Sequence, residues 1–467
     1  MSTEWTAQEI AEATKGLVTG DWIARSVSID TRTLTPGALF VALPGERVDG
    51  HAYVAAALEK GAVAALVNRQ IDGIAPERLV IVRDVEKALQ ALGIAARARS
   101  GAKFIGITGS VGKTGAKEML AVALQAIGKV YATKGNLNNH LGVPLSLANM
   151  PKTIDYAVIE MGMNHGGEIA PLSRWARPHV ALITTVEAVH LEHFVNVEAI
   201  ADEKATIFDG MVEGGVAVLN ADNPHFARLQ NHAQARGISN ILTFGTSAQT
   251  TCQLVDYRIE STYSRVEATI AGTPIAYPLG TIGKHWALTS VAVLAIVDAL
   301  GGDIARAAAA LEHFSEPAGR GKIRELKVGG GHLRLIDDSY NASPISMKGA
   351  VEKLAEIRDA TPGGARTVVV LGDMLELGEH AEEMHVGLVP TLINNQMDLV
   401  FAAGTFMEKL YHALPETMRG AYKATSRELA PVVVDAVRAR DLVLVKGSHG
   451  SRMDAVVRAI EENADAL

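Results

Sequence analysis

The stretch TGSVGKTGAKEML, residues 108–120, decides the fold of this chain, because it joins a predicted strand to a predicted helix through a glycine-rich turn. The apolar run FIGIT, residues 104–108, precedes the turn, and Lys113 and Thr114 stand where the helix is expected to begin. Glycines allow backbone N–H groups to approach phosphate oxygens, and the N-terminus of a helix adds positive potential. The segment therefore predicts a phosphate-binding loop within an α/β domain.

The turn departs at one position from the common phosphate-loop pattern, which is a glycine, four further residues and then Gly-Lys-Ser/Thr. Ile107 occupies the position of the first glycine, while Gly109 and Gly112 remain. We expect Lys113 to reach the β- and γ-phosphates of a nucleotide and the Thr114 hydroxyl to hold Mg²⁺. A glycine-rich turn without a ligand is the alternative, and the lysine-threonine pair between strand and helix disfavours it.

Composition narrows the classes of protein and of partner. The chain has 467 residues, of which 48% are hydrophobic and 21% charged, and its formal net charge of −8 gives no general case for a nucleic-acid partner. Cys252 is its single cysteine, which fits a reducing compartment. The first residues lack the pattern of a signal peptide, and no apolar run is long enough to span a bilayer. We expect a cytoplasmic monomer without a membrane span.

Two breaks rich in small or turn-forming residues, ARARSGAK at 96–103 and SEPAGRGK at 315–322, divide the chain into three domains. We expect a small α/β N-terminal domain at 1–100, a central P-loop domain at 101–315 and a C-terminal Rossmann-like domain at 316–467. The fold class is therefore α/β with open, mostly parallel sheets. The apolar runs that predict buried parallel strands are FIGIT, DYAVIEMG, HVALITTV, HLRLIDDS, RTVVVLGDM, LVFAAG and LVLVKGS.

Three further residues are candidates for a metal site beside the loop. Glu160 closes a predicted strand, and a Mg²⁺ ligand and a strand-end carboxylate in water are equally good interpretations of it. A lone histidine is more often structural than a ligand, but His190 ends another strand at the same sheet edge, which makes a metal role an alternative. By spacing alone, Lys204 is better interpreted as a solvated lysine near Glu203.

Together these motifs resemble the Mur ligases, the ATP-dependent amide-forming enzymes of bacterial peptidoglycan synthesis and cell-wall biogenesis. TGSVGKT is similar to the variant phosphate loop of that family, and VIEMGMNHGGEI, HLEHF and ADEKATIF follow in the family's order. Further blocks resemble the members that join D-alanyl-D-alanine to UDP-N-acetylmuramoyl-tripeptide. These blocks are DTRTLTPGALFVALPGERVDGH, KGNLNNHLGVPLSL, IDDSYNASPISMKGA, LGDMLELGEHAEEMH and LVKGSHGSRM.

The resemblance implies a role for each matching residue. It implies a UDP-sugar site in the N-terminal domain, ATP in the central domain with two Mg²⁺ ions, and third-domain residues that reach across to the nucleotide. Some members of the family carry the lysine at the position of Lys204 as a carbamate, which would present a carboxylate to the metal. The implied catalytic residues are Lys113, Lys204, His190 and Arg320. The implied ATP contacts are Thr108, Gly109, Ser110, Val111, Gly112, Lys113, Thr114, His285, Arg320 and Asp338. The implied metal ligands are Thr114, Glu160, His190 and Lys204, and the implied substrate contacts are Ser28, Thr31, Arg32, Asn138 and Asn139.

One segment departs from the family. GKHWALTS keeps His285 but has Trp286 and Thr289 where the family often has asparagines near the adenine. The adenine contacts of this segment stay open, and stacking of Trp286 on the base is one hypothesis.

The activity that the resemblance implies is an ATP-dependent ligase that forms an acyl phosphate and needs no protein nucleophile. Two alternatives remain. A sister ligase, such as the one that adds the third peptide residue, would share the phosphate loop and metal residues but differ in the N- and C-terminal blocks. A nucleotide-dependent switch would bind a protein partner, although the chain lacks the Asn/Thr-Lys-x-Asp element that selects guanine.

Overall fold

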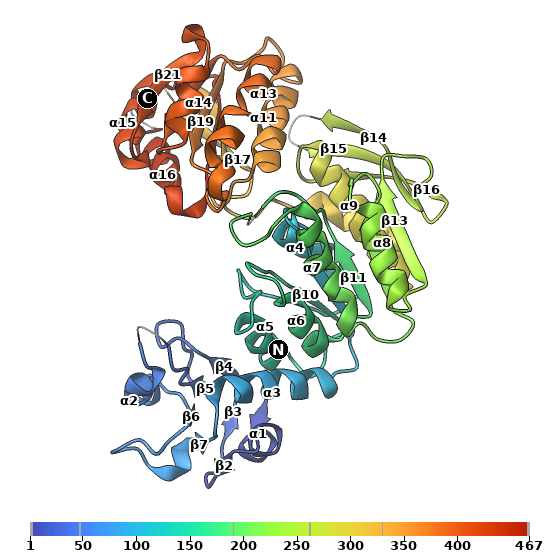
Figure 1. The fold of residues 1–467 in the computed structure, drawn as a ribbon, viewed down its shortest axis with the longest axis vertical. Helices are drawn as coiled ribbons and strands as arrows, with labels where there is room; N and C mark the ends of the chain where they lie inside the picture. The colour runs from blue at the N-terminus through green and yellow to red at the C-terminus, as the bar shows by residue number, and fades with distance from the viewer. Residues whose placement is uncertain (1–2, 46–47, 190, 261–262, 329, 465–467) are drawn as a thin grey trace.

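Three blocks of sheet and helix follow one another along the chain in a computed structural model, which describes residues 3–45, 48–189, 191–260, 263–328 and 330–464. Their main sheets have five, nine and six strands. The first block lies at the bottom of Figure 1 and the last at the top, so the central block separates them. The prediction of an α/β protein in three domains is confirmed, while the residue boundaries between them stay predictions.

The central sheet shows why its strands read as continuous apolar runs. β8 (Lys103–Thr108) lies between β10 (Tyr156–Glu160) and β11 (Val180–Ile183) and is parallel to both. Ile105 belongs to the core on one face of the sheet and Phe104 to the core on the other. Both faces are therefore buried, as is typical of parallel sheets covered by helices. The remaining parallel strands are β9 (Val130–Ala132), β12 (Val216–Asn220) and β13 (Asn240–Gly245).

Three strands extend this sheet in a way that the sequence pattern did not predict. β14 (Cys252–Glu260) continues the sheet beside β13, and β15 (Tyr263–Ile270) and β16 (Thr273–Leu279) pair in antiparallel fashion beyond it. The sheet is thus mixed, with a parallel part that carries the phosphate loop and an antiparallel wing.

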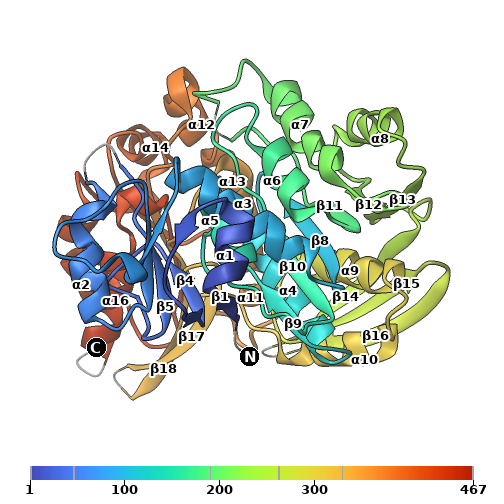
Figure 2. The same cartoon turned by 90° about the horizontal axis from the view of Figure 1, so that it is seen from below.

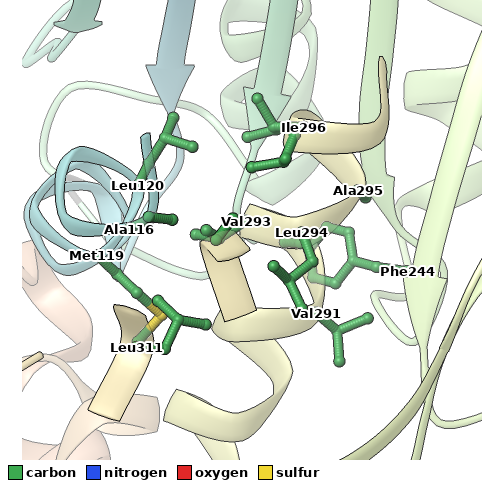
Figure 3. Packing of buried hydrophobic residues seen from close by; sticks show 14 of the residues in the cluster. Ala116, Met119, Leu120, Phe244, Val291, Val293, Leu294, Ala295, Ile296 and Leu311 are labelled. Atoms are coloured by element: carbon green, nitrogen blue, oxygen red, sulfur yellow. The ribbon is translucent and has the colours of Figure 1, made fainter. Parts of the chain in front are cut away.

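Helix α4 (Lys113–Gln125), which follows the phosphate loop, packs on α9 (Lys284–Ala299). Figure 3 shows Met119 of α4 directed toward Leu311 and Ala116 of α4 beside Val293. All of these side chains are fully buried. Because the helix is fixed by this core, the loop at its N-terminus is held at the edge of the sheet.

The C-terminal domain repeats the parallel arrangement. The strands predicted from HLRLIDDS, RTVVVLGDM, LVFAAG and LVLVKGS lie side by side, and the register places Asp338 opposite Lys446 at one sheet edge. These strands are β18 (Gly331–Asp338), β19 (Thr367–Gly372), β20 (Leu399–Ala403) and β22 (Leu442–Lys446), flanked by the antiparallel β17 (Lys322–Val328) and the parallel β21 (Arg419–Lys423).

The N-terminal domain is joined to the central domain by a packed interface. Both views place α3 (Val85–Ala98) beside α5 (Gly142–Ala148) (Figures 1 and 2). Trp5 Nε1 donates to the carbonyl of Ala148 over 2.9 Å, and Ala148 belongs to the core of the first domain. Helix α3 ends at Ala98, so the chain is still helical at the start of the first predicted break, residues 96–103. The strands of this domain are β1 (Trp5–Thr6), β2 (Leu17–Val18), β3 (Ile23–Ala24), β4 (Ser26–Ser28), β5 (Ala38–Val41), β6 (Ala64–Val67) and β7 (Leu79–Ile81).

In the part of the chain that the structure describes, every helix is too short or too polar to cross a bilayer. The apolar α9 has 16 residues and is buried in the central domain. The other helices are α1 (Ala7–Thr14), α2 (Val54–Glu59), α6 (Ile169–Ala176), α7 (Val197–Ala205), α8 (Phe226–Ala235), α10 (Ile304–Ala310), α11 (Pro344–Asp359), α12 (Ala381–Val386), α13 (Val389–Asn394), α14 (Met407–Ala413), α15 (Ser426–Ala436) and α16 (Asp454–Asn463).

The contact between α3 and α5 gives a prediction about stability. A Cβ at Gly93 would lie 2.9 Å from the Cα of Pro144, whereas a Cβ at Gly349 in α11 would meet nothing within 4 Å. In a helix, alanine is otherwise favoured over glycine by about 0.5–1 kcal/mol. We expect Gly93→Ala to destabilise the protein by about 1 kcal/mol or more, because the two backbones must separate, and Gly349→Ala to be neutral or stabilising. Urea unfolding followed by circular dichroism checks both, and equal stabilisation by the two variants would contradict the tight contact.

Candidate active site

Two glycines shape the loop between β8 and α4. Gly109 has a φ of +150°, and a Cβ there would lie 1.9 Å from Thr184 Oγ1. Gly112 has a φ of +87°, a left-handed conformation that glycine adopts without strain. No side chain among the described residues caps α4 at this end. The first N–H groups of the helix are therefore available to an anion.

The side chains of the other loop residues hold the loop in place. Ser110 Oγ donates to the carbonyl of Glu187 over 3.1 Å and accepts from its N–H over 2.9 Å. The carbonyl of Val111 accepts from Thr184 Oγ1 over 2.6 Å, and the Thr108 side chain is buried beneath the loop. The N–H of Ser110 also donates to the carbonyl of Thr185 over 2.8 Å. The role of these three residues in binding ATP stays a prediction.

Lys113, the lysine of the motif, folds back over the loop. Its Nζ donates to the carbonyl of Gly109 over 2.7 Å and to that of Ser110 over 3.4 Å. Burial lowers the pKa of Lys113, the Glu160 carboxylate offsets part of that effect, and the charge of Arg320 lowers the pKa further. Backbone carbonyls are weak partners for an ammonium compared with a phosphate oxygen. The geometry thus leaves Lys113 ready to exchange them for an anion.

Glu160 is the centre of the hydrogen-bond network behind the loop, and only 1% of it is exposed. Its Oε1 accepts from Thr114 Oγ1 over 3.2 Å and from Asn138 Nδ2 over 2.8 Å. Its Oε2 has no hydrogen-bond partner among the described residues and lies 3.8 Å from the Nζ of Lys117. The interpretation of Glu160 as a strand-end carboxylate in water is therefore wrong, because the side chain is buried.

The residues around Glu160 fit a magnesium ion. A buried carboxylate oxygen without a hydrogen bond needs a partner, and Mg²⁺ is usually held by one or two carboxylates together with phosphates and water. The Thr114 hydroxyl lies on the same carboxylate. Among the described residues no cluster of three or more His, Cys, Asp or Glu side chains is placed to hold a metal, and His190, the predicted histidine ligand, lies outside them.

Lys204 on α7 is a buried lysine, with 2% of it exposed. Its pKa lies well below the usual value because of burial first and the nearby charge of Lys113 second. Glu203 accepts from the N–H groups of Gly167 and Ile169 over 2.7 and 2.9 Å. The interpretation of Lys204 as a solvated lysine is therefore wrong. The implied role as a carbamylated metal ligand stays a prediction.

The third domain brings positive charge toward the loop. The Arg320 guanidinium lies 4.5 Å from the centre of the Tyr340 ring and is near enough to Lys113 to lower its pKa. Asp338 is paired with the buried Lys446 over 2.6 Å. His285 stands exposed at the start of α9, beside the Lys353 side chain at the junction with this domain. The structure thus gathers the three predicted residues around the junction between the central and third domains, and their ATP contacts stay predictions.

A cavity of about 980 Å³ lies between the first and central domains. Ser28, Thr31 and Arg32 line it from the first domain, as the resemblance implies for a UDP-sugar site. The chain segment after β9 supplies Lys134 and Leu137 to the opposite wall. The structure therefore brings the three predicted residues into one cavity, although their contact with substrate stays a prediction.

The two predicted asparagines, Asn138 and Asn139, make hydrogen bonds within the central domain. Asn138 donates to Glu160, and Asn139 Oδ1 accepts from Gly142 N over 2.8 Å at the start of α5. Neither residue lines the cavity, whereas Ser28 does.

The hypothesis that Trp286 stacks on adenine is wrong, because its ring is buried in the core. A Cβ on Gly115 would lie 2.4 Å from the ring.

Sequence reasoning missed two polar residues at these sites. Lys117 is fully buried and lies beside Glu160. Ser146 lines the cavity, is 1% exposed and has an Oγ without a hydrogen-bond partner among the described residues. The spacing of Lys117, four residues after Lys113, was a usable signal because such residues share one face of a helix. Ser146 gave no comparable signal.

Comparisons with known proteins agree with this geometry. Residues 24–100 match the Mur ligase family catalytic domain, 107–297 the Mur ligase middle domain, and 319–449 the glutamate ligase domain of Mur ligases. The UDP-N-acetylmuramoyl-tripeptide–D-alanyl-D-alanine ligase of Rickettsia prowazekii is 34% identical over 97% of this chain and 99% of its own length. The ligase of the same name from Escherichia coli is also 34% identical, over 98% of each chain.

Solved structures give the same result. MurF from Acinetobacter baumannii superposes with a TM-score of 0.86 at 28% identity over 98% of this chain and 99% of its own. MurF ligase from Thermotoga maritima, solved in complex with ADP, superposes with a TM-score of 0.79 at 27% identity over 94% and 98%. The sequence relatives and the solved structures both extend over nearly the whole length. This chain therefore belongs to the Mur ligase family.

Proposed function

We propose that the chain is an ATP-dependent ligase that joins D-alanyl-D-alanine to UDP-N-acetylmuramoyl-tripeptide and so forms the pentapeptide precursor of peptidoglycan. The observation that carries the proposal is the arrangement of the cavity, the phosphate loop and the third domain. A large cavity lies between the first and central domains, and Arg320 of the third domain lies near Lys113 of the phosphate loop. Curated relatives that bear the name of this activity match nearly the full length of the chain.

The reaction needs an activated acid, because an amine does not displace O⁻ from a carboxylate at a useful rate. The terminal carboxylate of the tripeptide attacks the γ-phosphorus of ATP, the bond to ADP breaks, and an acyl phosphate forms. The amine of D-alanyl-D-alanine then attacks the acyl carbon, loses a proton, and expels phosphate. Closed domains exclude the water that would hydrolyse the acyl phosphate.

Residues of the chain supply the positive charge that stabilises the transferred phosphoryl group and the side chains that position it. Lys113 leaves the carbonyls of Gly109 and Ser110 and binds the transferred phosphoryl group, with Arg320 approaching from the third domain. Thr114, Glu160 and His190 would hold Mg²⁺, and we propose that a second Mg²⁺ ion binds beside the first. When bound, Mg²⁺ neutralises the negative charge of the phosphates.

Lys204 acts as a carbamate in this proposal. A carbamate forms on a neutral amine, and burial together with the charge of Lys113 lowers the pKa of Lys204. The modified side chain would bring a negative group to a position where a buried ammonium is costly. We place the enzyme in the cytoplasm as a monomer, with which the free, buried Cys252 is compatible.

The proposed activity is tested by its product. With ATP, Mg²⁺, UDP-N-acetylmuramoyl-tripeptide and D-alanyl-D-alanine, we expect mass spectrometry to find the pentapeptide in equal amount to ADP. ADP should not accumulate when either the tripeptide or the dipeptide is left out. Steady ATP hydrolysis without both substrates, and no pentapeptide, would instead favour a nucleotide switch.

Replacement of the loop lysine tests the phosphate role. We expect Lys113→Ala to lower kcat by roughly 10²–10³-fold or more, as is typical when a charge stabiliser is removed, and to leave the fold intact because the side chain bonds only loop carbonyls. Lys129→Ala, at an exposed lysine, is the control and should match the wild type. Equal kcat values for the two variants would refute the role of Lys113.

Chemical rescue tests the carbamate. Lys204→Ala should lose most of its activity, and added acetate or formate should restore part of it, since a small carboxylate would occupy the space of the carbamate. Lys113→Ala serves as the comparison, because no carboxylate can replace its cation. Failure of every short carboxylate to restore Lys204→Ala would count against the carbamate.

A further inference from the structure

Lys117 is a fully buried lysine that the reaction described above does not use. It stands on α4 four residues after Lys113, and none of its side chain is exposed. A buried ammonium is costly unless it is paired and hydrogen-bonded. Lys117 lies about one helical turn beyond the phosphate loop, so contacts with other parts of the protein must compensate its charge there.

Hydrogen bonds and an ion pair compensate the buried charge of Lys117. Its Nζ donates to the carbonyl of Thr133 over 2.6 Å and to that of Gly135 over 3.4 Å. It also forms an ion pair with Glu118 Oε1 at 2.9 Å. Glu160 Oε2, at 3.8 Å, feels the charge but receives no hydrogen bond. This oxygen stays open to another ligand.

Lys117 holds the carbonyls of Thr133 and Gly135. Both belong to residues 133–139, a segment that lies between β9 and α5. One side of this segment lines the large cavity through Lys134 and Leu137. The other side reaches Glu160, because Asn138 Nδ2 donates to Oε1 over 2.8 Å and Thr133 Oγ1 accepts from the N–H of Glu160 over 3.2 Å. The segment therefore connects the cavity with the carboxylate behind the phosphate loop.

We propose that Lys117 is a positioning residue that clamps residues 133–139 onto α4 and thereby orients Glu160 for its metal ion. The inference rests on the proposed function. Lys117 touches no reacting atom. It acts through Asn138, which donates a hydrogen bond to Glu160 Oε1. It also acts through its own charge, which attracts Glu160 Oε2 without making a hydrogen bond to it. One buried cation thus holds together the wall of the substrate cavity and the ligand of the metal.

The test compares Lys117→Met with Met119→Ala, a variant on the same helix that removes buried volume from the core on the α9 side. In the ligand-free protein, hydrogen–deuterium exchange of residues 133–141 should be at least ten times faster in Lys117→Met than in the wild type. In turnover, the Mg²⁺ concentration at half-maximal rate should rise about tenfold. Met119→Ala should lower the unfolding midpoint and leave both quantities unchanged.

Lys117→Gln, which keeps amide donors without the charge, is the second variant and should shift both quantities in the same direction. Exchange and Mg²⁺ requirement equal to those of Met119→Ala would overturn the proposal. So would failure of both Lys117 variants to fold, since the residue would then serve general stability. If the wild type forms no pentapeptide, the proposed function fails, while the exchange comparison still decides whether Lys117 clamps the segment.

Discussion

The rest of the site depends on a buried carboxylate at the end of β10. Glu160 is hydrogen-bonded through one oxygen to Thr114 and Asn138, and its other oxygen, which has no hydrogen-bond partner among the described residues, lies 3.8 Å from the Nζ of Lys117. A buried negative charge is tolerated only when it is compensated. This requirement ties the start of α4, the end of β10 and the 133–139 segment to one point beside the predicted phosphate loop.

Positive charge around that point exceeds what Glu160 balances. Lys113 is half-buried and Lys204 buried, and the charge of Lys113 lowers the pKa of Lys204. The arrangement is expected for a site whose full complement includes the phosphates of ATP, because an anion between the lysines removes their repulsion. Arg320 adds a cation that belongs to another domain, so in the proposed function closure of that domain and phosphate binding would stabilise each other.

Much of this could be predicted from the sequence, because parallel strands buried on both faces give continuous apolar runs and the phosphate loop has a local glycine pattern. The antiparallel wing from β14 to β16 was missed, since its strands lack such runs. Lys204 and Trp286 were misjudged for a related reason: burial comes from residues far apart in the chain, and local spacing does not report it. Lys117 escaped notice because its partners, the carbonyls of 133 and 135, are set by tertiary contact.

The most direct measurement of the central claim is a crystal structure with a non-hydrolysable ATP analogue and Mg²⁺. The account predicts that the β- and γ-phosphates lie on the backbone N–H groups at the start of α4. Lys113 Nζ should have moved from the carbonyl of Gly109 to a phosphate oxygen, and a metal ion should lie on Glu160 Oε2. A nucleotide bound elsewhere, with Lys113 still on the loop carbonyls and Glu160 without a metal, would contradict it.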